Sequence, residues 1–184
     1  MLRKKRTYSL VAILALLPIY FVATPTIAQA SDPCSPSSKV AKSPNVGAVQ
    51  FKNVKQSIKG VSYPAGGILL PPDGITFAGL SRRHQPLSSD QGTSVVIWHT
   101  DYNKCVNKLN AIKSAKIGDS IKVTDENGEV KNYKVTRKVS VPYGQYESDW
   151  FIQNGPRRIL FVTCTGKFVN KHYTNTLVVF GSPA

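Results

Sequence analysis

The chain has 184 residues, with 24 Lys and Arg against 10 Asp and Glu, a net charge of +14, and three cysteines. This length suffices for one domain with a full core and is short for two domains. A nucleic-acid partner is not expected, because the chain has no zinc-type cysteine pairing, recognition-helix pattern or aromatic RNA-binding signature. Its scattered lysines favour a solvated surface over a polyanion-binding one.

The first 30 residues have the build of a secretory signal peptide or membrane anchor. Four basic residues come first, a mostly apolar run follows from Tyr8 to Ala23, and Ala28-Gln29-Ala30 forms a small-x-small cleavage site. Cleavage and retention both stay open, because the run is nearly long enough to span a membrane. We expect the domain on the extracellular face of the plasma membrane, anchored or secreted. Without residues 1–30 the chain loses four basic residues, and its net charge is +10.

Residues 31–45 are rich in Ser, Pro and Lys and predict a flexible spacer, so the domain is expected to cover 46–184. Alternating or continuous apolar runs predict short strands in this domain. The expected strands cover 46–54, 60–63, 68–70, 94–98, 120–124, 130–139, 159–162 and 176–180. The segment 75–93 is expected to be a connection without regular structure.

One short surface helix is predicted from Cys105 to Ala115, where apolar residues recur at three-residue spacing between lysines and asparagines. Asn127-Gly128 predicts the tip of a hairpin. Thr165-Gly166 predicts the turn that ends the buried strand 159–162. Seven to eight short strands and one helix indicate an all-β fold, a closed or nearly closed β-barrel.

The three cysteines predict one disulfide and one free thiol in an exported protein. Cys34 and Cys105 lie in polar surroundings and are the easy pair to join, although both can also be free. Cys164 is expected to be unpaired in either case. It is then either an inert buried thiol or a nucleophile.

His99 and Cys164 have the same placement relative to a strand: each directly follows an apolar strand. If the two strands are neighbours in one barrel, both side chains reach the same rim. An imidazole there can stabilise a thiolate and then protonate a leaving amine. His84 and His172 lie in polar loop contexts and are expected to be ordinary surface histidines.

The chain resembles a sortase, nearest to the compact, single-anchor class F. The similarity runs from about Val46 to Phe180 and depends on motifs in the same order and spacing. These motifs are Ile68-Leu69-Leu70-Pro71-Pro72-Asp73, Ser94 to Asp101, Ile117 to Val123, Leu160 to Gly166 and Tyr173 to Val179. The strand ends Thr163-Cys164 and His99-x-Asp101, with a helix and a hairpin between them, are the most specific part.

The resemblance implies a sortase β-barrel and a cysteine transpeptidase without metal or organic cofactor. Cys164 would attack the Thr-Gly carbonyl of an LPxTG-like sorting signal, and His99 would act as general acid and then base. Asp101 and Thr163 would support these residues. The partners would be sorting-signal peptides of exported proteins and an amine of a cell-wall precursor or protein.

Two positions depart from the family pattern. Trp98 stands where the family has Gly, and Thr174 stands where the family has the arginine that holds the substrate carbonyl. Thr174 is expected on the rim beside Cys164 and His99. No arginine follows Arg158 in the sequence, and Lys171 is the nearest cation. Arg82 and Arg83 would have to reach the rim from the loop before Ser94.

Losing one oxyanion donor costs about a hundredfold to a thousandfold in rate. Three hypotheses are therefore kept: a working sortase, a sortase-like domain that binds peptide without efficient catalysis, and a secreted β-domain with a structural thiol.

Overall fold

The structure is a computed structural model and describes residues 32–36, 38–62 and 69–184. The predicted signal peptide or anchor, residues 1–30, lies outside the described residues. Within the described part, no helix is long and apolar enough to cross a membrane.

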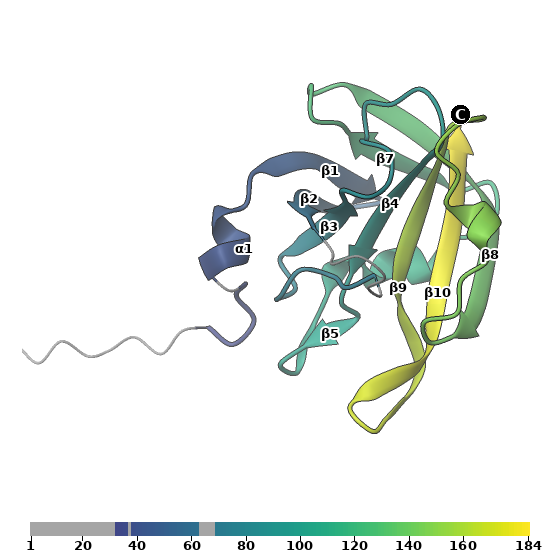
Figure 1. Cartoon of the computed structure of the whole chain (residues 1–184). Helices are drawn as coiled ribbons and strands as arrows, with labels where there is room; N and C mark the ends of the chain where they lie inside the picture. Colours follow the sequence, from purple (N-terminus) through teal and green to yellow (C-terminus); the bar gives the residue numbers. More distant parts are fainter. Residues whose placement is uncertain (1–31, 37, 63–68) are drawn as a thin grey trace, which may run out of the picture. The chain divides into compact units, whose positions relative to one another are not determined.

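Strands dominate the described residues, with α1 before the first strand and two 3₁₀ helices between later strands (Figure 1). In chain order the elements are α1 (Ser38–Lys42), β1 (Asn45–Phe51), β2 (Val54–Val61), β3 (Phe77–Ser81), β4 (Thr93–Trp98), β5 (Asp101–Tyr102), β6 (Cys105–Val106), the 3₁₀ helix η1 (Lys108–Ser114), β7 (Ser120–Thr124), β8 (Val130–Pro142), the 3₁₀ helix η2 (Ser148–Trp150), β9 (Arg158–Val169) and β10 (His172–Pro183).

Eight of these strands close into a barrel in the order β1-β2-β3-β4-β9-β10-β8-β7. The pairs β2–β3 and β4–β9 are parallel, and the others are antiparallel. The predicted all-β barrel is confirmed. β4 and β9 are far apart in the sequence but adjacent in the sheet, so they begin at one end of the barrel and finish at the other.

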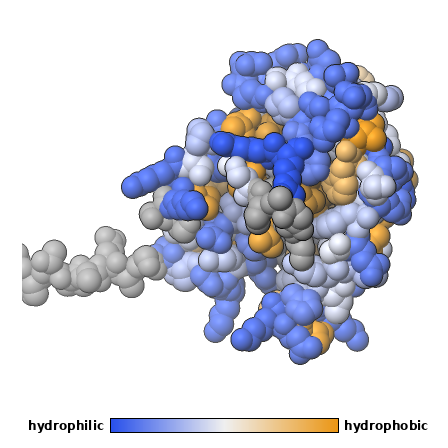
Figure 2. Space-filling view, viewed as in Figure 1, coloured by the Kyte–Doolittle hydropathy of each residue, from blue (hydrophilic) through white to orange (hydrophobic). Residues whose placement is uncertain are grey.

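Apolar side chains form two clusters on the two faces of β4, β9 and β10. Val96, Trp98 and Phe161 belong to the first, which draws on all eight barrel strands and fills the interior. Val95, Ile97 and Val162 belong to the second, on the outer face, where Trp150 of η2 covers them. The prediction that Ile159 to Val162 is buried on both faces is therefore confirmed. Figure 2 shows that the surface seen from this side is mostly hydrophilic, with hydrophobic residues in small separate patches.

Several predicted strand boundaries are wrong. Residues 46–54 are not one strand, because a tight turn at Lys52, with φ of 53°, separates β1 from β2. The alternating apolar pattern continues across this turn, so it did not reveal the break. Residues 69 and 70 are not in a strand, whereas 77–81, expected to be a connection, form β3.

The hairpin of β9 and β10 is longer than predicted. The expected turn at Thr165-Gly166 is wrong, since β9 continues to Val169 and β10 begins at His172. Gly166 has φ of +85°, a conformation that L side chains rarely adopt, and lies where the register to β10 shifts between Tyr173 and Asn175. The glycine therefore marks a bulge in the hairpin.

The described part of the predicted spacer, residues 31–45, is attached to the barrel. It contains α1 and a disulfide from Cys34 to Cys105, with a Cα to Cα distance of 5.5 Å. Lys59 of β2 is only 6% exposed, and its Nζ donates to Ala41 O at 3.3 Å and to Ser43 O at 2.5 Å. The described part of the predicted spacer therefore contacts the barrel through a disulfide and hydrogen bonds.

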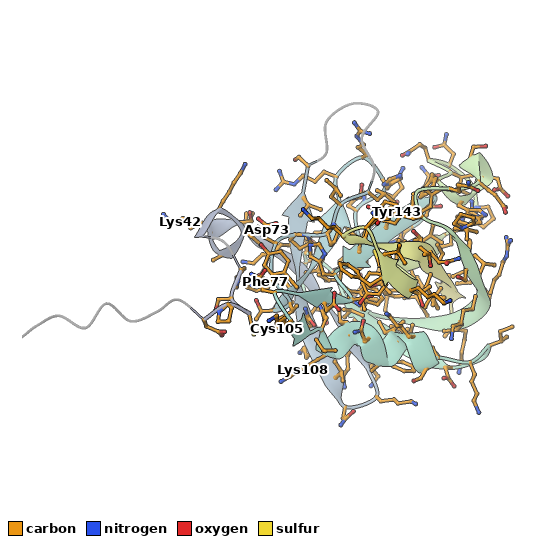
Figure 3. All side chains as sticks on the ribbon, turned by 90° about the horizontal axis from the view of Figure 1, so that it is seen from below. Lys42, Asp73, Phe77, Cys105, Lys108 and Tyr143 are labelled. Carbon is orange, nitrogen blue, oxygen red and sulfur yellow. A yellow bond between two sulfur atoms is a disulfide. The ribbon has the colours of Figure 1, made fainter. Side chains whose placement is uncertain are left out.

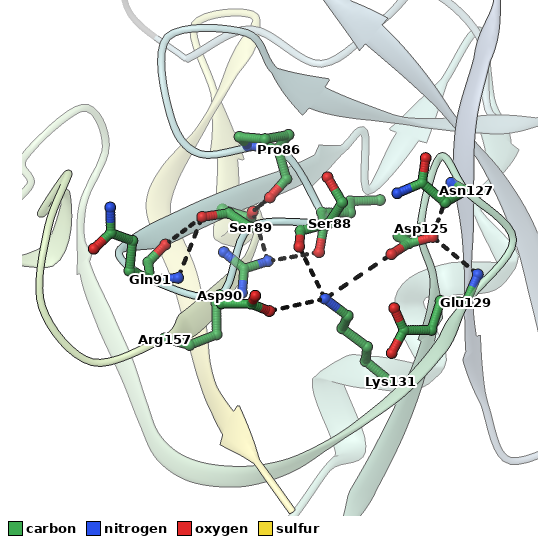
Figure 4. A network of polar contacts seen from close by, with 12 residues as sticks. Pro86, Ser88, Ser89, Asp90, Gln91, Asp125, Asn127, Glu129, Lys131 and Arg157 are labelled. Carbon is green, nitrogen blue, oxygen red and sulfur yellow. Dashed lines mark hydrogen bonds and ion pairs between the residues drawn. The ribbon is translucent and has the colours of Figure 1, made fainter.

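The end of the barrel where β4 and β9 begin is held by buried polar contacts (Figure 4). Arg157 is 9% exposed and donates to Tyr133 Oη, Leu87 O and Ser94 Oγ at 3.2, 3.1 and 2.9 Å. Lys131 donates to Ser88 O at 3.0 Å, with its Nζ 3.9 Å from buried Asp125 Oδ2. These two cations hold the loop between β3 and β4 against the barrel.

Candidate active site

The strand ends that follow β4 and β9 lie side by side. In the parallel pair, Trp98 of β4 is level with Thr163 of β9. Carried one residue further, this register brings His99 level with Cys164, and neighbouring strands are about 4.8 Å apart. Both residues line one pocket, as the sequence predicted for neighbouring strands.

This pocket has a volume of about 480 Å³ and lies on the outer face of the sheet. Cys164 continues the side of β9 that carries Val162, and Thr176 is its partner on β10. The segment after β8 forms one wall, and the hairpins β5–β6 and β9–β10 form others. The lining includes Leu69, Leu70, Pro71, Ile97, Tyr102, Tyr143, Tyr146, Val162, Phe168 and His172. Figure 3 views this end of the barrel from below, with Asp73, Cys105 and Tyr143 labelled.

A hydrogen bond joins two walls of the pocket. Tyr173 Oη of β10 donates to Asp101 Oδ2 of β5 at 2.6 Å. Burial and the adjacent Asp101 raise the pKa of Tyr173 to about 12, so the phenol stays protonated at neutral pH. Asp101 lines the pocket, and its supporting role stays a prediction; its contact is Tyr173, which the sequence analysis missed.

The two hairpins carry the same turn beside the pocket. Asn103-Lys104 and Asn170-Lys171 each have two consecutive residues with positive φ, between 49° and 67°. This is the conformation of a type I′ turn, which Asn tolerates well at its first position. Lys104 and Lys171 both line the pocket, and the repeated Asn-Lys pair was the signal in the sequence that could have located them.

Burial acts in opposite directions on the two reactive groups. It raises the pKa of the Cys164 thiol, with Asp101 adding to this shift and Lys113 opposing it. It lowers the pKa of His99, against the charges of Asp73 and Asp101. At neutral pH the ground state is therefore a neutral thiol beside a neutral imidazole, and the ion pair is a minor form.

Thr163 supports the strand end from the other face of the sheet. It is buried, its hydroxyl donates to Trp98 O at 2.9 Å, and its oxygen lies 3.1 Å from Thr100 Oγ1. Trp98 is also buried and points into the barrel, with its Nε1 donating to Asn110 Oδ1 at 3.2 Å. The indole therefore fills the barrel rather than narrowing the pocket beside the cysteine.

Thr174 does not lie on the pocket rim where it was expected. Its hydroxyl donates to Asn175 Oδ1 at 2.7 Å and accepts from the Lys167 N–H at 3.1 Å, and it packs against Gly166. Thr174 lies at the bulge of the hairpin, where two residues of β9, Gly166 and Lys167, are opposite this one residue of β10. Tyr173 faces the pocket in its place.

The described lining of the pocket contains no arginine. Arg82 packs against Gly60 of β2, with its Nε 2.7 Å from where a Cβ at residue 60 would be. Neither Arg82 nor Arg83 lines the pocket, whereas Lys171 does. His172, expected to be an ordinary surface histidine, is also a lining residue, and its ring centroid is 5.7 Å from that of Tyr143.

The cysteine pairing leaves Cys164 free, and the disulfide of Cys34 reaches the hairpin that forms one wall of the pocket. A second contact, from Asn103 Nδ2 to Pro33 O at 3.2 Å, supports the same attachment. Among the described residues, no group of three or more His, Cys, Asp or Glu side chains is arranged to hold a metal ion.

Comparison with known proteins identifies the fold and the family. The family model of the sortase domain matches residues 73–184, more than half of the chain. Sortase C1 of Streptococcus agalactiae in complex with MTSET is 16% identical, with 76% of this chain and 69% of that chain covered and a TM-score of 0.59. Sortase A from Corynebacterium diphtheriae is 17% identical, with 78% of this chain and 62% of that chain covered and a TM-score of 0.60. Listeria monocytogenes sortase A is 18% identical, with 76% of this chain and 87% of that chain covered and a TM-score of 0.56. Curated proteins gave no match.

Proposed function

Because the chain belongs to the sortase family, we propose that it is an exported cysteine transpeptidase in which Cys164 is the nucleophile and His99 the general acid and base. The observation that carries this proposal is the parallel register of β4 and β9, which brings the two residues level on adjacent strands at one pocket. A thiol and an imidazole in this relation are the minimum set for covalent acyl transfer.

The reaction has two halves. The Cys164 thiolate attacks the carbonyl carbon of the Thr-Gly bond in an LPxTG-like sorting signal, and the C–N bond breaks as the His99 imidazolium gives its proton to the leaving amine. A thioester remains on Cys164. An acceptor amine then attacks the thioester and loses a proton to His99, and the thiolate leaves.

The partners follow from this chemistry. The donor is a sorting-signal peptide of an exported protein, and the acceptor is an amine of a cell-wall precursor or another surface protein. The predicted export segment, residues 1–30, would deliver the domain to the extracellular face of the membrane. The class F assignment rests on the sequence motifs, since the solved relatives named above are sortases C and A.

A second candidate function is peptide binding without efficient catalysis. Two observations favour it: the raised pKa of Cys164 and the absence of arginine from the described pocket lining. The positive charges that line the pocket come instead from Lys104 and Lys171. A lysine offers a point charge without the two parallel donors of a guanidinium, so we expect slow turnover.

The test is acylation of the purified domain by peptides that carry an LPxTG-like signal, measured by intact mass, with Cys164→Ala as the control. An adduct of the acyl fragment on the wild type, and none on Cys164→Ala, supports the transpeptidase. Peptide binding without an adduct supports the binding module. If the peptides do not bind, the cysteine is a structural thiol and the proposal fails.

A further inference from the structure

Helix η1 presents a polar face to the strand end that carries the candidate nucleophile. A 3₁₀ helix has three residues per turn, so Asn107, Asn110 and Lys113 lie on one side of η1. Leu109 and Ile112 face the barrel interior and are fully buried. In Figure 3, η1 lies on one side of the β9–β10 hairpin and Tyr143, a pocket residue, on the other. The polar face therefore approaches the strand end from behind the pocket.

Each member of this face makes a defined hydrogen bond. Asn107 caps the helix, with its Oδ1 accepting from Leu109 N at 2.9 Å. Asn110 Nδ2 donates to Thr100 O at 2.7 Å. Lys113 Nζ donates to Thr100 Oγ1, also at 2.7 Å. Two side chains of η1 thus hold the residue that directly follows His99.

Thr100 connects Lys113 to Cys164 by hydrogen bonds. Its hydroxyl donates to the backbone carbonyl of Cys164, while its oxygen accepts from Lys113. A hydroxyl has one proton and two lone pairs, so this arrangement uses the proton and one of the lone pairs. The path from the ammonium to the Cys164 backbone therefore has a single intervening side chain.

We propose that Lys113 is a positioning residue, which fixes the Cys164 strand end through Thr100 and stabilises the thiolate with its positive charge from the side opposite the pocket. This role extends the proposed function and rests on it, because Lys113 matters for catalysis only if Cys164 is the nucleophile. Lys113 does not line the pocket and so is not placed to touch substrate.

The charges around Cys164 agree with this role. Burial raises the pKa of the Cys164 thiol, with Lys113 opposing this shift and Asp101 adding to it. Burial lowers the pKa of Lys113, and the charges of Cys164 and Asp101 oppose that shift. The other titratable or charged groups that face Cys164 or share its pocket are His99, Tyr102, Lys104, Tyr143, Tyr146, Lys171, His172 and Tyr173.

The experiment is the pH dependence of Cys164 alkylation by iodoacetamide, followed by intact mass without reductant, so that the Cys34–Cys105 disulfide stays closed. Lys113→Met removes the charge, Lys113→Gln keeps a hydrogen-bond donor without charge, and Lys113→Arg keeps both. Lys108→Met removes an exposed lysine from the same helix as the matched control.

Only the thiolate reacts, so the rate rises with pH until the thiol is fully ionised. Loss of the nearby charge should lower the rate below that point by about threefold to thirtyfold and move the midpoint to higher pH. Lys113→Arg and Lys108→Met should keep the wild-type profile. A purely structural role would leave the profile of the folded protein unchanged.

Two outcomes separate this inference from the proposed function. If Lys113→Met or Lys113→Gln is folded by circular dichroism and its profile matches the wild type, the role of Lys113 is overturned even when sorting-signal peptides acylate Cys164. If the profile shifts but no peptide acylates the wild type, the transpeptidase proposal fails and the effect of Lys113 on the thiol stands. Should Lys113→Met not fold, Lys113→Gln decides.

Discussion

At the end of the barrel where β4 and β9 begin, the polar network contains the buried Arg157 and Asp125 and the partly buried Lys131, whereas at the end where the same strands finish a thiol, an imidazole and phenols line a pocket. Arg157 makes three hydrogen bonds to other residues at the first end (Figure 4). Arginine does not change its charge in the pH range of proteins. At the second end, burial shifts the pKa of both His99 and Cys164.

The two ends of this pair of strands therefore have different roles: one end stabilises the fold, and the other carries the candidate chemistry. Permanent charges with several hydrogen bonds hold one end together, and removing them should change the free energy of unfolding. Groups that exchange protons line the other end, and removing them should change rates. The following substitutions test whether this division holds.

The largest effect is expected from His99→Ala. Loss of a general acid and base lowers acyl transfer by about a hundredfold to ten thousandfold. In the wild type the acid limb of the pH profile lies at the lowered His99 pKa and the alkaline limb at the raised Cys164 pKa, with a plateau between them. The variant should lose the plateau and rise about tenfold per pH unit, measured by initial rates of peptide cleavage. An unchanged profile would contradict the role of His99.

At the opposite end, Arg157→Leu should lower the free energy of unfolding by about 3 to 5 kcal/mol. The substitution leaves Leu87 O and Tyr133 Oη buried without their donor. Urea denaturation measures the change. Lys134→Leu, at an exposed lysine on the same strand as Tyr133, is the control and should stay within about 0.5 kcal/mol.

In the same variant, the alkylation rate of Cys164 in folded protein should match the wild type. A large fall in that rate, measured at a urea concentration where the protein is native, would show that the two ends are coupled. The division between stability and chemistry would then be lost.

Removing the disulfide tests the same division at the pocket end, because this structural bond lies beside the reactive groups. The pair of substitutions Cys34→Ser and Cys105→Ser opens a loop of 71 residues and should cost about 2 to 4 kcal/mol of stability. Peptide mapping of the wild type without reduction should find Cys34 joined to Cys105. Any bridge to Cys164 would remove it as a nucleophile.

The smallest effect is expected from Thr174→Arg, which restores the arginine of the family at its sequence position. Since Thr174 points away from the pocket, acyl transfer should change by less than about threefold, against the hundredfold or more that an oxyanion donor contributes. The same peptide acylation assay measures it. A gain of about a hundredfold would mean that the bulge at Tyr173 rearranges when substrate binds.

The sequence by itself determined the fold class and the candidate nucleophile. Continuous apolar runs at Ser94 to Trp98 and Ile159 to Val162 predict strands buried on both faces, and this depends only on local composition. The sortase motifs and the position of Cys164 directly after such a run also need no coordinates. The prediction that Cys164 stays unpaired rested on the polar surroundings of the other two cysteines.

Only the tertiary structure decided what surrounds that cysteine. Tyr173 and not Thr174 lines the pocket, and Thr174 lies at a bulge where two residues of β9 are opposite one residue of β10, which the sequence pattern did not reveal. Lys113 reached the strand end through contacts between residues 13 and 64 positions apart, from Lys113 to Thr100 and from Thr100 to Cys164. Local periodicity describes which face of an element is apolar, whereas which elements meet depends on how the barrel closes.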